Sequence, residues 1–167
     1  MDGQTHEIDK WDLIIAHPPC TYLSNAGACR LYPKKGELDK DRYIKGLNGK
    51  AFFMMFYWYG FYGVGKMVIE NPVPSSVYEL PKPTNIIQPY EFGDGYSKKT
   101  YLWEFGVPPL IPRYMGEGFK PYVSCGTSRN KGNADKAGFS RNGGASKVRS
   151  KTFDGIAQAM AEQWGNL

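Results

Sequence analysis

The chain of 167 residues is long enough for one domain of ordinary size and too short for two. Hydrophobic residues make up 41% and charged residues 22%, a balance that excludes global disorder, and no apolar run reaches the ~20 residues of a membrane span. Three cysteines, Cys20, Cys29 and Cys125, are odd in number and lack CxxC spacing, which argues against a disulfide framework and against a zinc knuckle. We therefore expect one domain over residues 1–167, cytoplasmic and reduced, with no metal site and no membrane partner.

The net charge of +5 is concentrated in one part of the chain. Residues 116–151 hold eight Lys or Arg against two acidic residues, a local net charge of +6. Such a basic, Gly- and Ser-rich stretch is typical of a flexible arm that contacts phosphates, and we expect Arg141, Lys147 and Arg149 to bind nucleic acid. A solvated loop that only keeps the protein soluble accounts for the same charges.

The first third of the chain predicts a strand, a loop and a long helix. Lys10–Ala16 is an almost continuous apolar run, typical of a strand buried on both faces, and Pro18 with Pro19 ends it. Thr21–Lys40 is polar and indicates a loop with at most one helical turn. Asp41–Tyr62 is the best candidate for a helix, although its many aromatic residues suit a strand equally well.

Further elements complete an α/β pattern. Lys66–Glu70 predicts a second short buried strand, and the order strand, loop, helix, strand favours a βαβ unit in a mostly parallel sheet. Pro72–Pro89 carries five prolines and is expected to be extended. Thr100–Phe105 predicts a third strand, and Asp154–Trp164 has apolar residues at the spacing of a short amphipathic helix.

Two predicted strand ends carry reactive side chains. Cys20 follows two prolines after the first strand, and Glu70 and Asn71 close the second. Ligands of parallel α/β sheets bind at the carboxyl ends of the strands, so adjacent strands would bring Cys20 and Glu70 to the same edge. A thiol held beside a carboxyl group suits nucleophilic catalysis. The alternative is that Cys20 is a small buried hydrophobe and Glu70 a surface charge.

These segments resemble the Pro-Cys and Glu-Asn motifs of DNA cytosine 5-methyltransferases. More closely, the chain is similar to small phage-encoded proteins of that family. The shared motifs follow one order and lie at Trp11–Thr21, Ile69–Val73, Ile87–Asp94, Lys98–Leu110 and Arg149–Trp164. The resemblance covers the chain from Trp11 to its end and implies a truncated methyltransferase-like, Rossmann-type fold. In that fold helices flank a mostly parallel sheet, and the basic stretch of residues 116–151 forms a long loop.

The resemblance also implies a mechanism. The thiolate of Cys20 would add to carbon 6 of a cytosine flipped out of DNA, while Glu70 would hydrogen-bond the ring nitrogen and Asn71 would help to orient the base. Carbon 5 would then take a methyl group from S-adenosylmethionine. The substrate-binding residues that follow from this resemblance are Pro18, Pro19, Thr21, Lys98 and Lys99.

One part of the family's pattern is missing. Its members begin with a further strand, a glycine-rich turn and an acidic strand end that bind S-adenosylmethionine, whereas no G-x-G follows an apolar strand here and Gly93–Gly95 is turn-like. We therefore expect a protein that is incomplete alone: part of a split enzyme, a truncated piece, or a remnant with another use. The alternative function is a non-catalytic phage protein that binds nucleic acid or a nucleotide and counters host defence.

The missing strand also predicts a partner. Without it, the strand Lys10–Ala16 would form an open apolar edge, which invites pairing with another chain. We expect a homo-oligomer, or a second polypeptide that completes the sheet. The alternative is that Met1–Asp9, or the Pro-rich segment after Asn71, folds over this edge.

Overall fold

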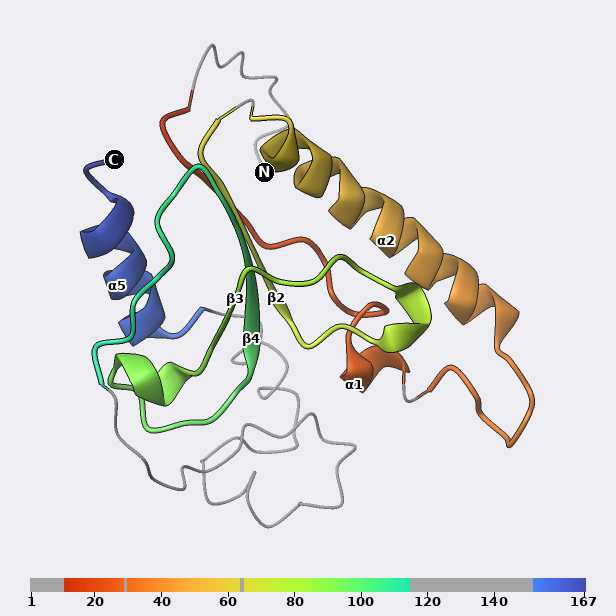
Figure 1. Ribbon diagram of the computed structural model, residues 1–167. Coiled ribbons are helices and arrows are strands. Elements are labelled where there is room, and N and C mark those ends of the chain that lie inside the picture. Colours follow the sequence, from red (N-terminus) through yellow and green to blue (C-terminus); the bar gives the residue numbers. More distant parts are fainter. Residues whose placement is uncertain (1–10, 29, 64, 115–151) are drawn as a thin grey trace, which may run out of the picture.

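A four-stranded mixed sheet lies between two helices in the computed structural model, which describes residues 11–28, 30–63, 65–114 and 152–167 (Figure 1). The strands are β1 (Ile14–Ala16), β2 (Met67–Pro72), β3 (Asn85–Ile87) and β4 (Thr100–Phe105), in the order β1-β2-β4-β3. The expected α/β architecture is therefore present. The basic stretch of residues 116–151 lies outside the described residues.

The expectation of a mostly parallel sheet is wrong for the described strands. Only β1 and β2 pair in parallel, whereas β4 runs antiparallel to both β2 and β3. Parallel neighbours need a long crossover that is usually helical, and the chain provides one only between β1 and β2. After β2 the chain returns through the short 3-10 helix η1 (Ser76–Tyr78), β3 and the 3-10 helix η2 (Pro89–Phe92), so that β4 enters the sheet from the opposite direction.

The long helix α2 (Lys40–Phe61) covers one face of the sheet and confirms the predicted helix to within one residue at each end. It begins where the side chain of Asp39 accepts a hydrogen bond from the backbone nitrogen of Arg42 at 2.9 Å, which satisfies one of the unpaired amides of the first turn. The buried side chains between α2 and the sheet are Leu23, Phe53, Ile69, Tyr78 and Trp103. A short helix α1 (Asn25–Ala28) lies within the predicted loop.

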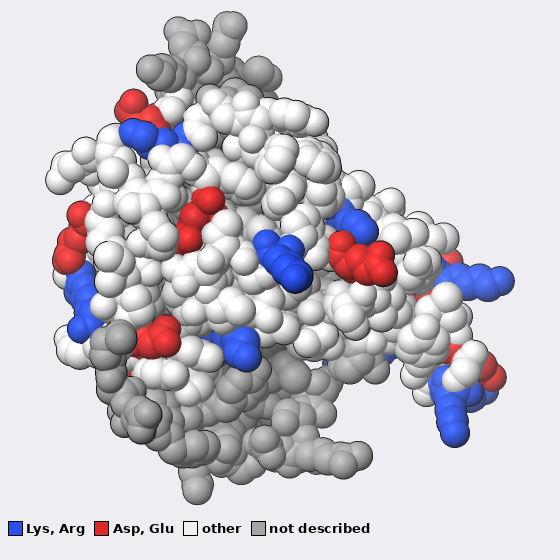
Figure 2. Space-filling view, viewed as in Figure 1, with Lys and Arg blue, Asp and Glu red and all other residues white. Residues whose placement is uncertain are grey.

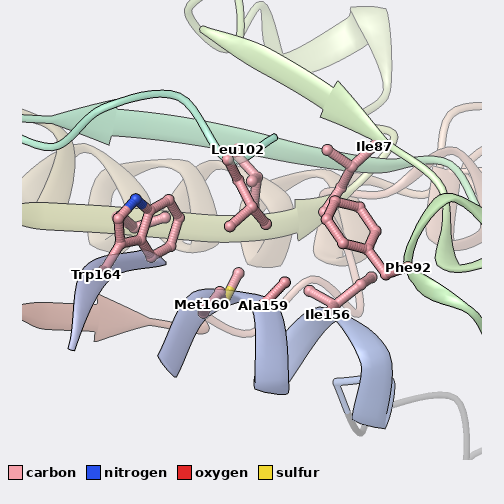
Figure 3. Close-up of a cluster of buried hydrophobic side chains, with 9 residues drawn as sticks. Ile87, Phe92, Leu102, Ile156, Ala159, Met160 and Trp164 are labelled. Carbon is pink, nitrogen blue, oxygen red and sulfur yellow. The ribbon is translucent and has the colours of Figure 1, made fainter. Parts of the chain in front are cut away.

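The C-terminal helix α5 (Asp154–Trp164) has the predicted bounds and covers the other face of the sheet. Successive residues of a strand point to opposite faces, so Val68 contacts the α5 side whereas Ile69 contacts the α2 side. Figure 3 shows side chains of the sheet and η2 that face those of α5, namely Ile87, Phe92, Leu102, Ile156, Ala159, Met160 and Trp164. Among the described helices none combines the length and the apolar character that crossing a membrane requires.

Candidate active site

The parallel pairing of β1 with β2 places the two predicted reactive segments at one edge of the sheet. Ala16 lies opposite Ile69 in the register of the two strands, so the next residues along each strand are His17 and Glu70. Nδ1 of His17 lies 2.7 Å from Oε2 of Glu70. The sheet thus joins a residue that directly follows β1 to a residue near the end of β2.

Glu70 is largely buried, with a side chain 10% exposed against 47% for His17. Burial by itself would raise the pKa of Glu70, but the hydrogen bond with His17 and the positive charge of Lys98 outweigh it. The hydroxyl of Thr152 donates a further hydrogen bond to Oε2 at 3.3 Å. Together these groups hold the pKa of Glu70 below its ordinary value of 4.5, so the carboxylate is ionised at neutral pH.

Asn71 connects β2 to the proline segment that follows β1. Its side chain is buried, and Nδ2 donates a hydrogen bond to the backbone oxygen of Pro18 at 3.3 Å. Neither Pro18 nor Pro19 has an N–H group, so the segment depends on such contacts to fix its position. Asn71 is therefore placed to position the segment that carries Cys20.

Cys20 is partly buried and lies on a segment that is held at both ends. Before Cys20 the segment is held by the hydrogen bond from Asn71 to Pro18. After it, the nitrogen of Ser24 donates a hydrogen bond to the backbone oxygen of Cys20 at 3.0 Å. Ser24 in turn forms a β-bridge with Pro74, just beyond β2. The Cys20 segment is thus attached to β2 through Pro18 and to the residues just after β2 through Ser24, and such a fixed segment suits a nucleophile.

The remaining predicted residues divide into three groups. Lys98 belongs to the site, because its charge acts on Glu70 and its Nζ lies 5.5 Å from the ring centre of Phe153. Pro18 is buried, whereas Pro19, Thr21 and Lys99 are exposed. The residues expected to bind nucleic acid, Arg141, Lys147 and Arg149, lie outside the described residues.

Sequence reasoning missed two partners of Glu70. His17 lies within the motif at Trp11–Thr21, for which no role of this residue was predicted. The register of two adjacent parallel strands places it beside Glu70. Thr152 lies 82 residues from Glu70 in the sequence, and no local pattern connects them. It is brought to the site because it precedes α5, which packs on the same side of the sheet as Val68.

The described residues do not fit S-adenosylmethionine, the cofactor that the resemblance implies. The turn after β1 contains two prolines, and β2 itself ends in Pro72 with Pro74 two residues later, so neither strand end offers the glycine-rich run of N–H groups expected of that site. Gly93–Gly95 follows η2, and Asp94 accepts a hydrogen bond from the nitrogen of Gly155 at 3.1 Å, which fixes the start of α5. No group of three or more His, Cys, Asp or Glu that could hold a metal ion occurs in the described part of the chain.

A carboxylate, an imidazole and an ammonium group thus act on one another at the carboxyl ends of β1 and β2, and the segment that carries Cys20 is attached to β2 beside them. The hydrogen bonds from His17 and Thr152 both reach Oε2 of Glu70. Comparisons of the chain with family models, with curated proteins and with solved structures found no match. This geometry and the motif resemblance are therefore the basis for a function.

Proposed function

We propose that this edge binds a cytosine flipped out of DNA, and that the chain is a DNA cytosine 5-methyltransferase-like protein of the phage type. The observation that carries the proposal is the pair of links across β1 and β2, from Asn71 to Pro18 and from His17 to Glu70. They hold the Cys20 segment and a buried carboxylate at one edge, as attack on a recognised base requires.

Recognition of the base follows from the ionised state of Glu70. The exocyclic amino group of cytosine is a hydrogen-bond donor, which a carboxylate accepts. Addition of the Cys20 thiolate to carbon 6 forms an S–C bond, and the electron pair of the 5,6 double bond moves through the ring to nitrogen 3. Nitrogen 3 then takes a proton from Glu70. Because Glu70 is ionised, it must first receive that proton, and the adjacent group able to supply it is His17.

The methyl donor in the resembling family is S-adenosylmethionine. Because the described residues do not fit S-adenosylmethionine, they account for the reaction only as far as the adduct between Cys20 and carbon 6. A second polypeptide that adds to β1 would supply the cofactor site, since β1 pairs on one side only among the described strands. Such an assembly would act in the cytoplasm of a phage-infected bacterium.

DNA must reach the site with its target base extruded, because carbon 6 is inaccessible inside a stacked duplex. The eight Lys and Arg of residues 116–151 would hold the phosphates on either side. The resemblance assigns Lys98 to the target base or its phosphate, and its action on Glu70 agrees with that position.

A second function is favoured by the same lowered pKa of Glu70. An ionised carboxylate already complements the amino group of unreacted cytosine, so the edge could retain a base without any covalent step. The protein would then be a non-catalytic phage factor that binds nucleic acid or a nucleotide and counters host defence.

DNA that contains 2-pyrimidinone in place of one cytosine separates the two functions. Carbon 6 of this base accepts a thiol without a methyl donor, so the catalytic site forms an adduct that survives denaturation. We expect the adduct from the natural chain and none from Cys20→Ser, whereas Cys29→Ser and Cys125→Ser retain it. Binding of the unmodified cytosine DNA without an adduct on the 2-pyrimidinone DNA supports the non-catalytic function, and absence of binding to either DNA at low salt contradicts both.

A further inference from the structure

The face of α2 that points away from the sheet carries large apolar side chains along its whole length. The residues Ile44, Leu47, Ala51, Met55, Trp58 and Tyr62, here called the outer stripe, are separated by three, four, four, three and four positions. This spacing places them along one side of a helix. Met55 is 67% exposed and Tyr62, the C-cap residue, is 74% exposed.

The C-terminal half of α2 is apolar on its outer face as well as on the face that packs against the sheet. From Ala51 to Phe61 it contains no charged and no amide side chain, and Phe52, Tyr59 and Phe61 flank the outer stripe with large exposed surfaces. A helix that is apolar all round is normally buried. The main contacts of α2 with described elements are with β2, β4 and η1, all on its inner side (Figure 1).

The exposed area is that of a protein interface. Eight large apolar side chains of α2 and its C-cap are 41% exposed or more, which amounts to roughly 600–1,000 Å² when a fully free large side chain is taken as ~150–250 Å². A stable interface of standard size takes ~800 Å² from each partner. Scattered apolar residues on the surface of a monomer do not form one strip of this size.

We propose that the outer stripe is a homodimer interface, in which α2 helices of two copies pack antiparallel about a two-fold axis between Ala51 and Met55. A symmetric dimer needs one patch that complements itself, and a stripe spaced by three and four packs against a copy of itself in this way. Antiparallel pairing sets Ile44 of one copy beside Tyr62 of the other, so that the whole stripe is covered.

The charges of α2 select the antiparallel arrangement. Its first half carries Lys40, Lys45 and Lys50, with Asp41 as the only acidic residue of the helix, and its second half is aromatic. Figure 2 shows charged atoms toward the N-terminal end of α2 and an uncharged surface over its C-terminal half. Parallel helices would bring the cationic first halves of the two copies together, whereas antiparallel helices set the first half of one copy against the aromatic half of the other. Lys40, which is exposed and lies four residues before Ile44 of the outer stripe, would then meet the rings of the other copy.

The proposed dimer leaves the candidate active site accessible. Glu70 accepts a hydrogen bond from Thr152, which precedes α5, so its carboxylate lies on the side of the sheet that α2 does not cover. Each copy would therefore keep its own site. The dimer does not depend on what that site binds.

Sedimentation equilibrium at micromolar concentrations tests the proposal. We expect the natural chain to have twice the 18.8 kDa mass of one copy. Met55→Lys sets two like charges at the two-fold axis and should raise the dimer dissociation constant by about thirtyfold or more. Ile111→Lys is the matched control, because Ile111 is 66% exposed outside α2, and this variant should dimerise as the natural chain does.

A second lysine variant and a cross-linking experiment test the same interface at the end of α2. Tyr62→Lys changes the exposed C-cap, whose ring contacts among the described residues are with the exposed Trp58 and Phe61 of the same helix and not with the core, and should also give monomers with an unchanged circular dichroism spectrum. In Tyr62→Cys, a thiol–amine cross-linker should join the new side chain to Lys40 of the other copy. A natural chain that stays monomeric at ~100 μM, or a dimer that survives both lysine variants, overturns the proposal.

Discussion

The imidazole of His17 and the carboxylate of Glu70 lie 2.7 Å apart, although 53 residues separate them in the chain. The contact exists because β1 and β2 are parallel neighbours in register, so the first residue after β1 meets the end of β2. Lys98 acts on the same carboxylate, and Thr152 donates a hydrogen bond to it. The charge of Glu70 is thus stabilised by three segments that are distant in the sequence.

Glu70→Gln should lower stability in a manner that depends on pH. The pKa of Glu70 is below 4.5 in the folded chain and near 4.5 in the unfolded chain, so its ionisation stabilises the fold fully above pH 4.5. This contribution is lost as the pH falls from 4.5 through the lower folded value. We expect the variant to lose about 1–3 kcal/mol at pH 7, as for other buried charge-assisted hydrogen bonds. Urea unfolding between pH 3 and 7 measures it, and a difference that does not shrink in acid contradicts the assignment.

His17→Gln should separate base binding from proton transfer. Glutamine can still donate a hydrogen bond to Glu70, but it cannot carry a proton to it. We therefore expect DNA affinity within about twofold of the natural chain and adduct formation with 2-pyrimidinone DNA slowed by about a hundredfold, a typical contribution of general acid catalysis. Equal rates for the two proteins would show that His17 has only a structural role.

Asn71→Ala should release the segment that carries Cys20. The change removes the hydrogen bond to Pro18 and leaves a buried carbonyl oxygen without its partner, which costs about 1–3 kcal/mol. The free energy of unfolding and the rate of Cys20 modification by a thiol reagent measure the two effects, and we expect the first to fall and the second to rise. Asn48→Ala, at an exposed position of α2, is the control and should change stability by less than about 0.5 kcal/mol. An unchanged thiol reactivity in Asn71→Ala contradicts the positioning role.

Apolar patterns predicted the elements that bury many side chains. The runs at Thr100–Phe105 and Asp154–Trp164 define β4 and α5 with the expected bounds, because each has a face that must be covered. The first strand, expected over Lys10–Ala16, is confined to Ile14–Ala16 within the described residues. The three-residue strand β3 lies in the proline-rich segment and pairs through its backbone with β4, so side-chain patterns carried no signal for it.

Apolar patterns could predict neither the direction of β4 nor all the side chains that surround Glu70. The alternation of side chains is the same for parallel and antiparallel strands, so the antiparallel entry of β4 could not be predicted from its composition. The sequence did predict that the Cys20 and Glu70 segments lie close together. A helix between two strands indicates a parallel pair, and β1 and β2 form that pair. The contact from Thr152 depends on how α5 packs, and packing is a property of the whole fold.

Gly46→Ala should destabilise the contact between α2 and η1. A Cβ atom at Gly46 would lie 2.1 Å from the ring of buried Tyr78, so the helix or the ring would have to move. We expect a loss of about 1–3 kcal/mol, as for other overpacked cores, measured by thermal unfolding. Gly49→Ala is the control three residues later, where Cβ would lie 3.3 Å from Cγ of Leu23, a contact that a shift of the leucine side chain by a few tenths of an ångström relieves. Its gain in helix propensity should leave stability equal or higher, and equal losses in the two variants would contradict this packing.

Neutralising Arg141, Lys147 and Arg149 together should weaken the salt dependence of DNA binding. Each phosphate contact releases condensed counterions, so the logarithm of affinity falls with the logarithm of salt concentration by ~0.9 per contact. If these three residues contact phosphates, their replacement by alanine should reduce that slope by about 2–3 and lower affinity similarly for all DNA sequences. The control replaces three exposed lysines of the described residues, Lys34, Lys35 and Lys82, and removes the same net charge. An equal reduction in both variants would show that net charge alone attracts DNA, and that the basic stretch of residues 116–151 is only a solvated loop.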